Sequence, residues 1–402
     1  MSKERFIEKL VLLIIISSVF LPGVVINDFS IRVDDFLVFI SFPLLFLLKS
    51  SISSSRLSIK YIGVILALVT STFLGYCLLD VPFSIRDVNE LFRLAKPFLL
   101  LVMIHYCDKE YLKIHLIRFF QYGTIFILAF AFLEFFNVLE FRRGLSFLYS
   151  SENYLYSGNY RLLLTAANPN VAAAIVLFFI LYQMTSFILN RDKLIPFLLM
   201  LSLLLVLLMT SSRTILLAFL LVFGLGMLRL VKTQRLLSVV VFLVVTLFTV
   251  VLLQYFSYLS VGFETFASGS NNSMIIRYKN WEDAFELFQQ SPLFGWGPAK
   301  AIHETIVDGE HFLLLRRFGL IGYSLILLLL TNGIFLFFKS KKVILEKLDL
   351  KIVYISYYSV FGVLVLMVTN NFFSGYQLML LYVLILSLAE HKINLAVRKK
   401  NA

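Results

Sequence analysis

The residues that most clearly suggest chemistry are arginines lying between the apolar stretches of the chain. Arg161, Arg213 and Arg277 each stand near polar or aromatic residues. Four more arginines lie in a connection or near the end of an apolar stretch: Arg142, Arg143, Arg316 and Arg317. A guanidinium group is planar and stays charged, so it can bind two oxygen atoms of a phosphate at once without a metal ion. Any one of these arginines also fits a membrane-surface anchor, but the set together predicts a site for an anionic ligand.

A second candidate is the sequence Asn168-Pro169-Asn170, which lies inside an apolar stretch. Proline within a helix removes one backbone hydrogen bond and leaves a carbonyl group without its partner. The amide side chains on either side can satisfy such groups or bind a ligand hydroxyl group. The motif therefore predicts either a structural kink or a substrate site formed by Asn168 and Asn170.

The third candidate is the segment 271–322, which interrupts the series of hydrophobic stretches and contains Trp281 and Trp296. Apolar residues recur in it at helical spacing: Trp281, Ala284, Phe285 and Phe288. This spacing predicts an amphipathic helix at the membrane surface over about 275–289. Such a helix can be a simple anchor. The neighbouring Arg277 favours a functional role, so we expect both tryptophans to contact the substrate.

These residues need a membrane scaffold to position them. The chain has 402 residues, is 60% hydrophobic and has a mean hydropathy of +0.89, far above a soluble domain. About twelve stretches are long enough to cross a bilayer as helices, which predicts an all-α polytopic membrane protein with one transmembrane domain over 1–402. The predicted spans are about 7–26, 34–48, 61–79, 91–106, 116–136, 163–188, 195–211, 214–229, 236–257, 313–338, 352–372 and 377–390.

The positions of the basic residues predict the orientation of this domain. Lysines and arginines cluster in every second connection and at both ends of the chain, so both termini are expected in the cytoplasm. Two long loops, 137–162 and 258–312, then lie outside and are expected to form a cap over the helices. The net charge of +12 fits this topology and contact with anionic lipid. It does not indicate a nucleic-acid partner.

Acidic and histidine residues show no metal-binding pattern. His303 and His311 are eight positions apart across a loop, and no carboxylate pair has the spacing that would complete a site with them. Asp34 and Asp35 are better explained as charges at a helix end than as a catalytic pair, because the predicted loop around them is short. We therefore expect no metal and no cofactor.

Several motifs in this order resemble the O-antigen polymerase and ligase family of bacterial membrane enzymes. The resemblance covers about 160–322 and, through the number of spans, the whole chain. Its elements are Arg161 followed by Asn168-Pro169-Asn170, Ser212-Arg213, Arg277 with Trp281, the turn Pro292-Leu293-Phe294-Gly295-Trp296-Gly297, and Asp308 to Gly322. The resemblance implies a metal-independent glycosyltransferase of the GT-C type in which Arg213 and Arg277 bind the diphosphate of an undecaprenyl-diphosphate-linked sugar, with Arg161 as a third candidate.

The residue that takes the proton from the acceptor hydroxyl group is left open by the sequence. The ligase branch of the family commonly has a His-Asn pair about eleven residues before the glycine that begins the next helix, and this chain has Asp308-Gly309 near that position. We rank Asp308 first as the catalytic base, His311 second and Glu310 third. The missing His-Asn pair favours a polymerase.

The function predicted from the sequence is polymerisation of lipid-linked repeat units into a capsule or O-antigen at the outer face of the bacterial cytoplasmic membrane. Undecaprenyl-diphosphate oligosaccharide would be both donor and acceptor, with a chain-length regulator and a flippase as further partners. One alternative is a ligase that transfers glycan to a lipid or wall acceptor. Another is a flippase or transporter, which should carry its charges deep in the bundle and have short outer loops.

Overall fold

The computed structural model describes residues 3–26, 29–46, 55–156, 160–256, 261–262, 264–265, 268–303, 307–375 and 377–401. Within these residues the chain is helical, apart from a short antiparallel hairpin of β1 (Gly23–Ile26) and β2 (Phe29–Arg32) in which Gly23 pairs with Arg32. The helical membrane-protein class predicted from the sequence is confirmed.

Eight helical spans in the described part of the chain are long and apolar enough to cross a membrane. They are α3 (Arg56–Leu78), α5 (Lys109–Phe135), α7 (Pro169–Leu189), α9 (Arg213–Val231), α10 (Arg235–Tyr255), the pair α13 (Glu310–Leu330) and α14 (Asn332–Ser340), α15 (Lys347–Leu366) and α16 (Gln377–Asn401). Four further helices coincide with the other predicted spans but are shorter or more charged: α1 (Lys3–Phe20), α2 (Val33–Phe46), α4 (Ile85–His105) and α8 (Leu194–Met209).

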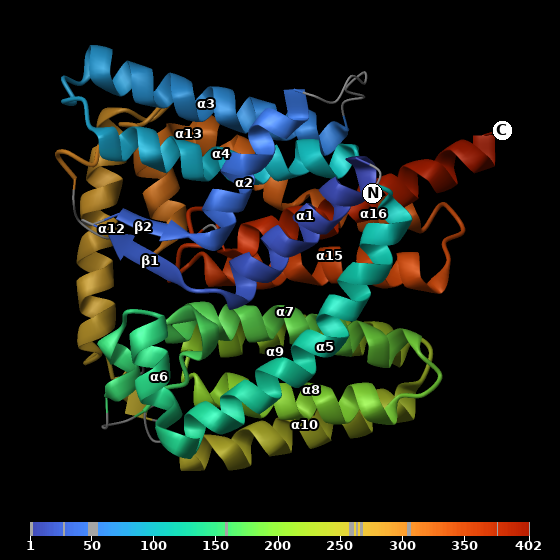
Figure 1. The fold of residues 1–402 in the computed structure, drawn as a ribbon. Coiled ribbons are helices and arrows are strands. Elements are labelled where there is room, and N and C mark those ends of the chain that lie inside the picture. The colour runs from blue at the N-terminus through green and yellow to red at the C-terminus, as the bar shows by residue number, and fades with distance from the viewer. Residues whose placement is uncertain are drawn as a thin grey trace.

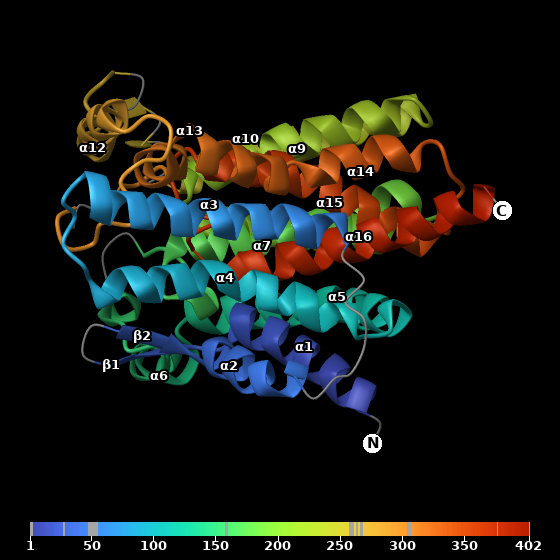
Figure 2. The same cartoon turned by 90° about the horizontal axis from the view of Figure 1, so that it is seen from above.

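Helix α7 lies at the centre of the bundle. Its residues from Ala172 to Phe187 are all buried, and it packs against α8, α9 and α15. In Figure 1, helices α7 to α10 form the lower part of the molecule and α3, α4 and α13 the upper part, with α15 and α16 between them. Figure 2 shows the long helices lying side by side with their axes roughly aligned. By contrast α10 exposes much of its apolar surface, as expected for a helix that faces lipid.

The two ends of the bundle differ. Both chain termini lie at one end, called the terminus end here (Figure 1). At the other end, helix α12 (Asn272–Gln290) runs across the bundle at a steep angle to the long helices. This end, called the α12 end, also carries the hairpin and α6 (Phe141–Leu148). Asn271 begins α12 by accepting a hydrogen bond from the backbone N–H of Met274.

Helix α13 is interrupted at Gly319, where φ is +58° and ψ is −168°. The turn at 292–297 fills the break. It donates two backbone N–H groups to the carbonyl oxygens of Arg316 and Arg317, at 3.0 and 2.7 Å, and two of its carbonyl oxygens accept N–H groups that follow Gly319, at 2.8 and 3.2 Å. A helix broken at a buried residue needs such substitute partners, because buried backbone groups without partners are costly.

Replacing Gly319 by alanine is expected to destabilise the protein by about 1–3 kcal/mol from backbone strain alone, since this conformation is open almost only to glycine. The added Cβ would also lie 2.6 Å from the backbone nitrogen of Phe294. The measurement is the temperature at which the purified protein in detergent loses its fold. Gly224→Ala in α9 is the control, because its Cβ would meet nothing within 4 Å. Equal melting temperatures for the two variants would contradict the role given to Gly319.

Candidate functional site

A polar pocket of about 260 Å³ lies at the α12 end, beside the first residues of α7. Its lining residues are Asn168, Asn170, Val171, Ala174, Asp308, Leu366, Asn370, Asn371, Phe372, Gly375, Gln377 and Leu378. Three predicted site residues, Asn168, Asn170 and Asp308, therefore come together although they are far apart in the sequence. The amides at 370, 371 and 377 were not predicted. A signal was present, because Asn370-Asn371 stands at the end of a predicted span, where polar side chains are costly.

Asn168 and Pro169 start α7 instead of bending it. The Asn168 side chain accepts a hydrogen bond from the backbone N–H of Asn170 at 2.9 Å, and Pro169 takes the first helical position, where its missing N–H costs nothing. The kink predicted from the sequence is therefore replaced by a helix start. This places Asn170 at the N-terminal end of α7, facing the pocket.

Arg161 and the hairpin before α9 lie next to Asn170. Arg161 donates to Asn170 Oδ1 at 3.3 Å and to the carbonyl oxygen of Thr210 at 2.9 Å, and Ser212 Oγ donates to Asn170 Oδ1 at 3.0 Å. Arg213 follows directly and donates to the Gly262 carbonyl oxygen at 2.8 Å. Neither arginine lines the pocket, but Arg161 contacts its residue Asn170 directly and Arg213 follows Ser212, which does so too.

Arg277 of α12 contacts the pocket residue Asp308. Its Nε lies 3.5 Å from Asp308 Oδ2, and the Asp308 side chain is half exposed. Trp281, one turn further along α12, donates its indole N–H to the backbone oxygen of Asp308 at 2.5 Å and stacks on Phe312 at 5.1 Å. Trp281 therefore positions the Asp308 loop and does not line the pocket. Trp296 is also elsewhere, with its indole N–H donated to the Leu287 carbonyl oxygen at 2.8 Å.

The other two candidate bases do not line the pocket. Glu310 is fully buried and accepts four hydrogen bonds, from the backbone N–H groups of Phe372, Phe373 and Ser374 and from the Ser374 hydroxyl group, at 2.6 to 2.8 Å. His311 contacts the Leu364 carbonyl oxygen at 3.2 Å through Nε2 and the Tyr323 hydroxyl group at 3.0 Å through Nδ1. Among the three, Asp308 is the one that lines the pocket.

The geometry can be compared with known proteins. Residues 197–317 match the sequence model of the O-antigen ligase family. This match, which covers less than half of the chain, supports membership of the O-antigen polymerase and ligase family. No curated protein matches the chain closely enough to be reported as a relative. The family contains glycosyltransferase-like membrane enzymes, and a function of the O-antigen ligase or polymerase type is supported for this chain.

The family match includes only part of the pocket. Arg213, Arg277 and Asp308 fall within 197–317, whereas Arg161, the start of α7 and the residues at 370–378 fall outside it.

A second buried carboxylate, Glu134, holds the backbone that follows Arg161. It accepts the backbone N–H groups of Leu163 and Leu164, at 2.7 and 2.8 Å, and the Tyr160 hydroxyl group at 2.7 Å. Burial raises the pKa of Tyr160, so its hydroxyl group remains a donor.

The remaining arginines of the predicted set do not line the pocket. Arg317 binds Glu90 at 2.8 Å, and Lys300 lies 3.5 Å from the same carboxylate. Arg142 donates to the Glu134 and Phe135 carbonyl oxygens. Arg316 is buried, and Arg143 is exposed beside Glu140. Burial and the Arg316 charge lower the pKa of nearby His303.

Asp34 and Asp35 are held in an ion-pair cluster. Lys96 lies 2.5 Å from a carboxylate oxygen of each, and Arg32 Nε binds Asp34 at 3.0 Å. Both aspartates therefore have structural partners. Among the described residues, no three histidine, cysteine, aspartate or glutamate side chains gather as a metal site would require. Metal independence remains a prediction.

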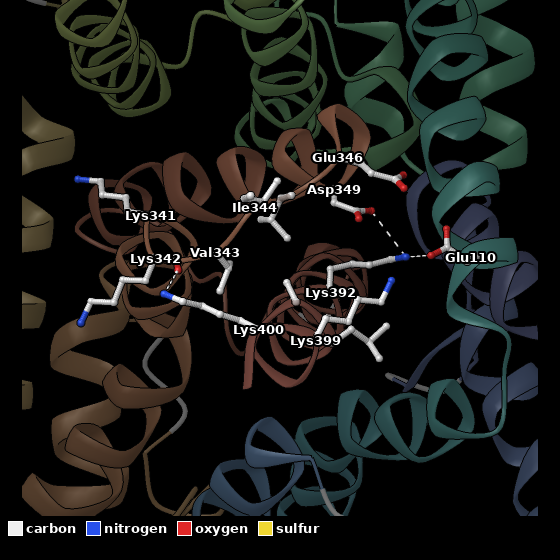
Figure 3. Close-up of a pocket in the computed structure, with 13 residues that line it drawn as sticks. Glu110, Lys341, Lys342, Val343, Ile344, Glu346, Asp349, Lys392, Lys399 and Lys400 are labelled. Atoms are coloured by element: carbon white, nitrogen blue, oxygen red, sulfur yellow. Dashed lines mark hydrogen bonds and ion pairs between the residues drawn. The ribbon is translucent and has the colours of Figure 1, made fainter. Parts of the chain in front are cut away.

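A larger pocket of about 670 Å³ lies at the terminus end and is lined mostly by lysines and acidic residues (Figure 3). Lys392 lies between Asp349 and Glu110, and Lys400 donates to the Lys342 carbonyl oxygen at 3.2 Å. This pocket contains none of the predicted site residues. Its lysines match the basic connections that predict the cytoplasmic side.

Proposed function

We propose that this protein is a polymerase that joins undecaprenyl-diphosphate-linked repeat units into a surface polysaccharide, capsule or O-antigen. The observation that carries the proposal is the α12-end pocket, where Asp308 and several amides lie beside arginines. The pocket offers a base, hydrogen-bonding groups for a sugar and cations for a diphosphate, which are the groups that glycosyl transfer requires.

The proposed orientation places the terminus end in the cytoplasm and the α12 end on the outer side of the inner membrane. The lysines at the terminus end support this assignment (Figure 3). In the same proposal α1, α2, α4 and α8 join the eight long spans to give about twelve in a GT-C-like arrangement. The loops 137–162 and 258–312 then lie over the outer face, with α12 at the bilayer surface.

In the proposed reaction Arg213, Arg277 and Arg161 hold the diphosphate of the donor. Asp308 takes the proton from an acceptor hydroxyl group, and the oxygen of that group attacks the anomeric carbon of the donor sugar. The bond between that carbon and the diphosphate oxygen breaks, and the electron pair leaves with undecaprenyl diphosphate. The arginines stabilise the charge that develops on the leaving group.

Chelation is expected to leave the reaction unchanged, because the proposed site neutralises the diphosphate with arginines alone. Purified protein in liposomes, given the lipid-linked repeat unit from cells that lack this enzyme, should yield a ladder of longer glycans. The ladder is measured with and without EDTA. Loss of the ladder in EDTA, restored by Mg²⁺ or Mn²⁺, would show that the reaction depends on a metal.

A ligase is the second candidate, and the family match, which is to an O-antigen ligase, favours it. In the liposome experiment a ligase would give one transfer to a separate acceptor and no ladder. A flippase would move the lipid-linked sugar across the bilayer without lengthening it, and this outcome would exclude both enzymatic functions. A chain-length regulator and a flippase remain proposed partners, and adding the regulator should change only the ladder's length distribution.

A further inference from the structure

The segment between α15 and α16 contributes amide side chains to the lining of the α12-end pocket. Asn371 Oδ1 and Gln377 Oε1 are both buried, and neither has a hydrogen-bond partner among the described residues. Both side chains belong to the pocket lining, together with Asn370. Buried polar atoms are nearly always paired in proteins, so unpaired oxygens on side chains that belong to a pocket lining point to a ligand that carries donors.

Hydrogen bonds to Glu310 and Thr214 hold this segment in place. The buried Glu310 carboxylate accepts the three successive N–H groups at 372–374, and the Glu310 N–H donates to the Met367 carbonyl oxygen at 2.8 Å. Thr369 and Thr214 share a hydrogen bond of 2.5 Å, which joins the segment to the first turn of α9 beside Arg213. The amides are thus preorganised at a fixed position relative to the arginines.

The chemistry of these groups fits a sugar better than a phosphate. The amide oxygens and the Asp308 carboxylate are acceptors, which repel phosphate oxygens but bind hydroxyl donors. An amide also offers an N–H donor beside its oxygen, so it can pair with two neighbouring hydroxyl groups. The volume of about 260 Å³ is below the roughly 300–1,000 Å³ of pockets for drug-sized ligands, so the space suits one sugar residue and not a whole repeat unit.

We propose that Asn371 and Gln377 form a carbohydrate subsite that binds the terminal sugar of the acceptor glycan and directs one of its hydroxyl groups toward Asp308. The inference rests on the proposed function, since it assigns the acceptor side of the same site. The inference divides the proposed site into an acceptor part and a donor part. The amides bind the acceptor sugar, and Arg161, Arg213 and Arg277 bind the donor diphosphate.

The test measures two kinds of binding to the purified protein in nanodiscs. The first probe is the oligosaccharide released by mild acid from the lipid-linked repeat unit, detected by saturation-transfer NMR. The second is undecaprenyl diphosphate. Asn371→Ala and Gln377→Ala are each expected to weaken oligosaccharide binding about tenfold, the effect of one lost hydrogen bond in a buried site, and to leave undecaprenyl diphosphate binding unchanged.

Two variants provide the controls. Asn190→Ala makes the same chemical change at the other end of α7 and should bind both probes as the original protein does. Arg213→Ala should lose undecaprenyl diphosphate and keep the oligosaccharide. Unchanged oligosaccharide binding by both amide variants would overturn the subsite while leaving the polymerase proposal in place. Failure of the original protein to bind either probe would overturn both.

Discussion

Replacing Arg213 by alanine is expected to lower the rate of glycan polymerisation by about 100-fold or more, the usual cost of removing one preorganised group that stabilises developing charge. Arg213 begins α9 next to Ser212, which is bonded to the pocket residue Asn170. Its guanidinium group donates to the Gly262 carbonyl oxygen and so has a fixed position. The measurement is the initial rate of ladder formation in liposomes.

A matched exposed arginine distinguishes this effect from a general loss of positive charge. The Arg143 side chain is 81% exposed and pairs with Glu140, so Arg143→Ala should keep nearly full activity. Arg213→Lys should retain part of the activity, because an ammonium group keeps the charge but loses the planar pair of donors. Full activity of Arg213→Ala in protein that binds undecaprenyl diphosphate normally would remove Arg213 from the donor site.

The helical class and several local features could be predicted from the sequence because each depends on nearby residues. The helix predicted over about 275–289 corresponds to α12 at Asn272–Gln290, since its apolar residues recur with the period of a helix. The number of spans is harder to predict. Apolar length alone gives about twelve. In the part of the chain that the structure describes, α2 has only 14 residues and α1 carries charged residues in its first turns, so eight spans meet both the length and the composition criteria there.

The roles of Glu134 and Glu310 could not be predicted, because they depend on partners far along the chain. Glu134 holds backbone about 30 positions away, and Glu310 holds the segment at 372–374, more than 60 positions away. In a sequence, an acid at a helix end looks the same whether it faces water or binds backbone N–H groups. The same applies to the two tryptophans. In a sequence, an indole that stacks on a sugar looks the same as one that donates its N–H to a backbone oxygen, as both do in the structure.

The structure narrows the choice of catalytic base by showing what each candidate already binds. Glu310 uses both carboxylate oxygens for backbone and hydroxyl donors, and both ring nitrogens of His311 have partners. The Asp308 carboxylate is half exposed in the pocket, and its ion pair with Arg277 is long, at 3.5 Å. The Asp308 carboxylate can therefore accept a proton from an acceptor hydroxyl group without the loss of hydrogen bonds that hold the fold. We infer that Asp308 is the base.

Asp308→Asn is accordingly expected to lower polymerisation by about 100-fold or more, the range for loss of a general base, because an amide of the same shape cannot take the proton. Trp281 bonds the backbone oxygen of residue 308 and would hold the loop in either protein. Glycan ladders and melting temperature are measured together, with Asp283→Asn on the exposed face of α12 as the control. A normal rate for Asp308→Asn, combined with a lost rate for His311→Gln at unchanged stability, would transfer the role to His311.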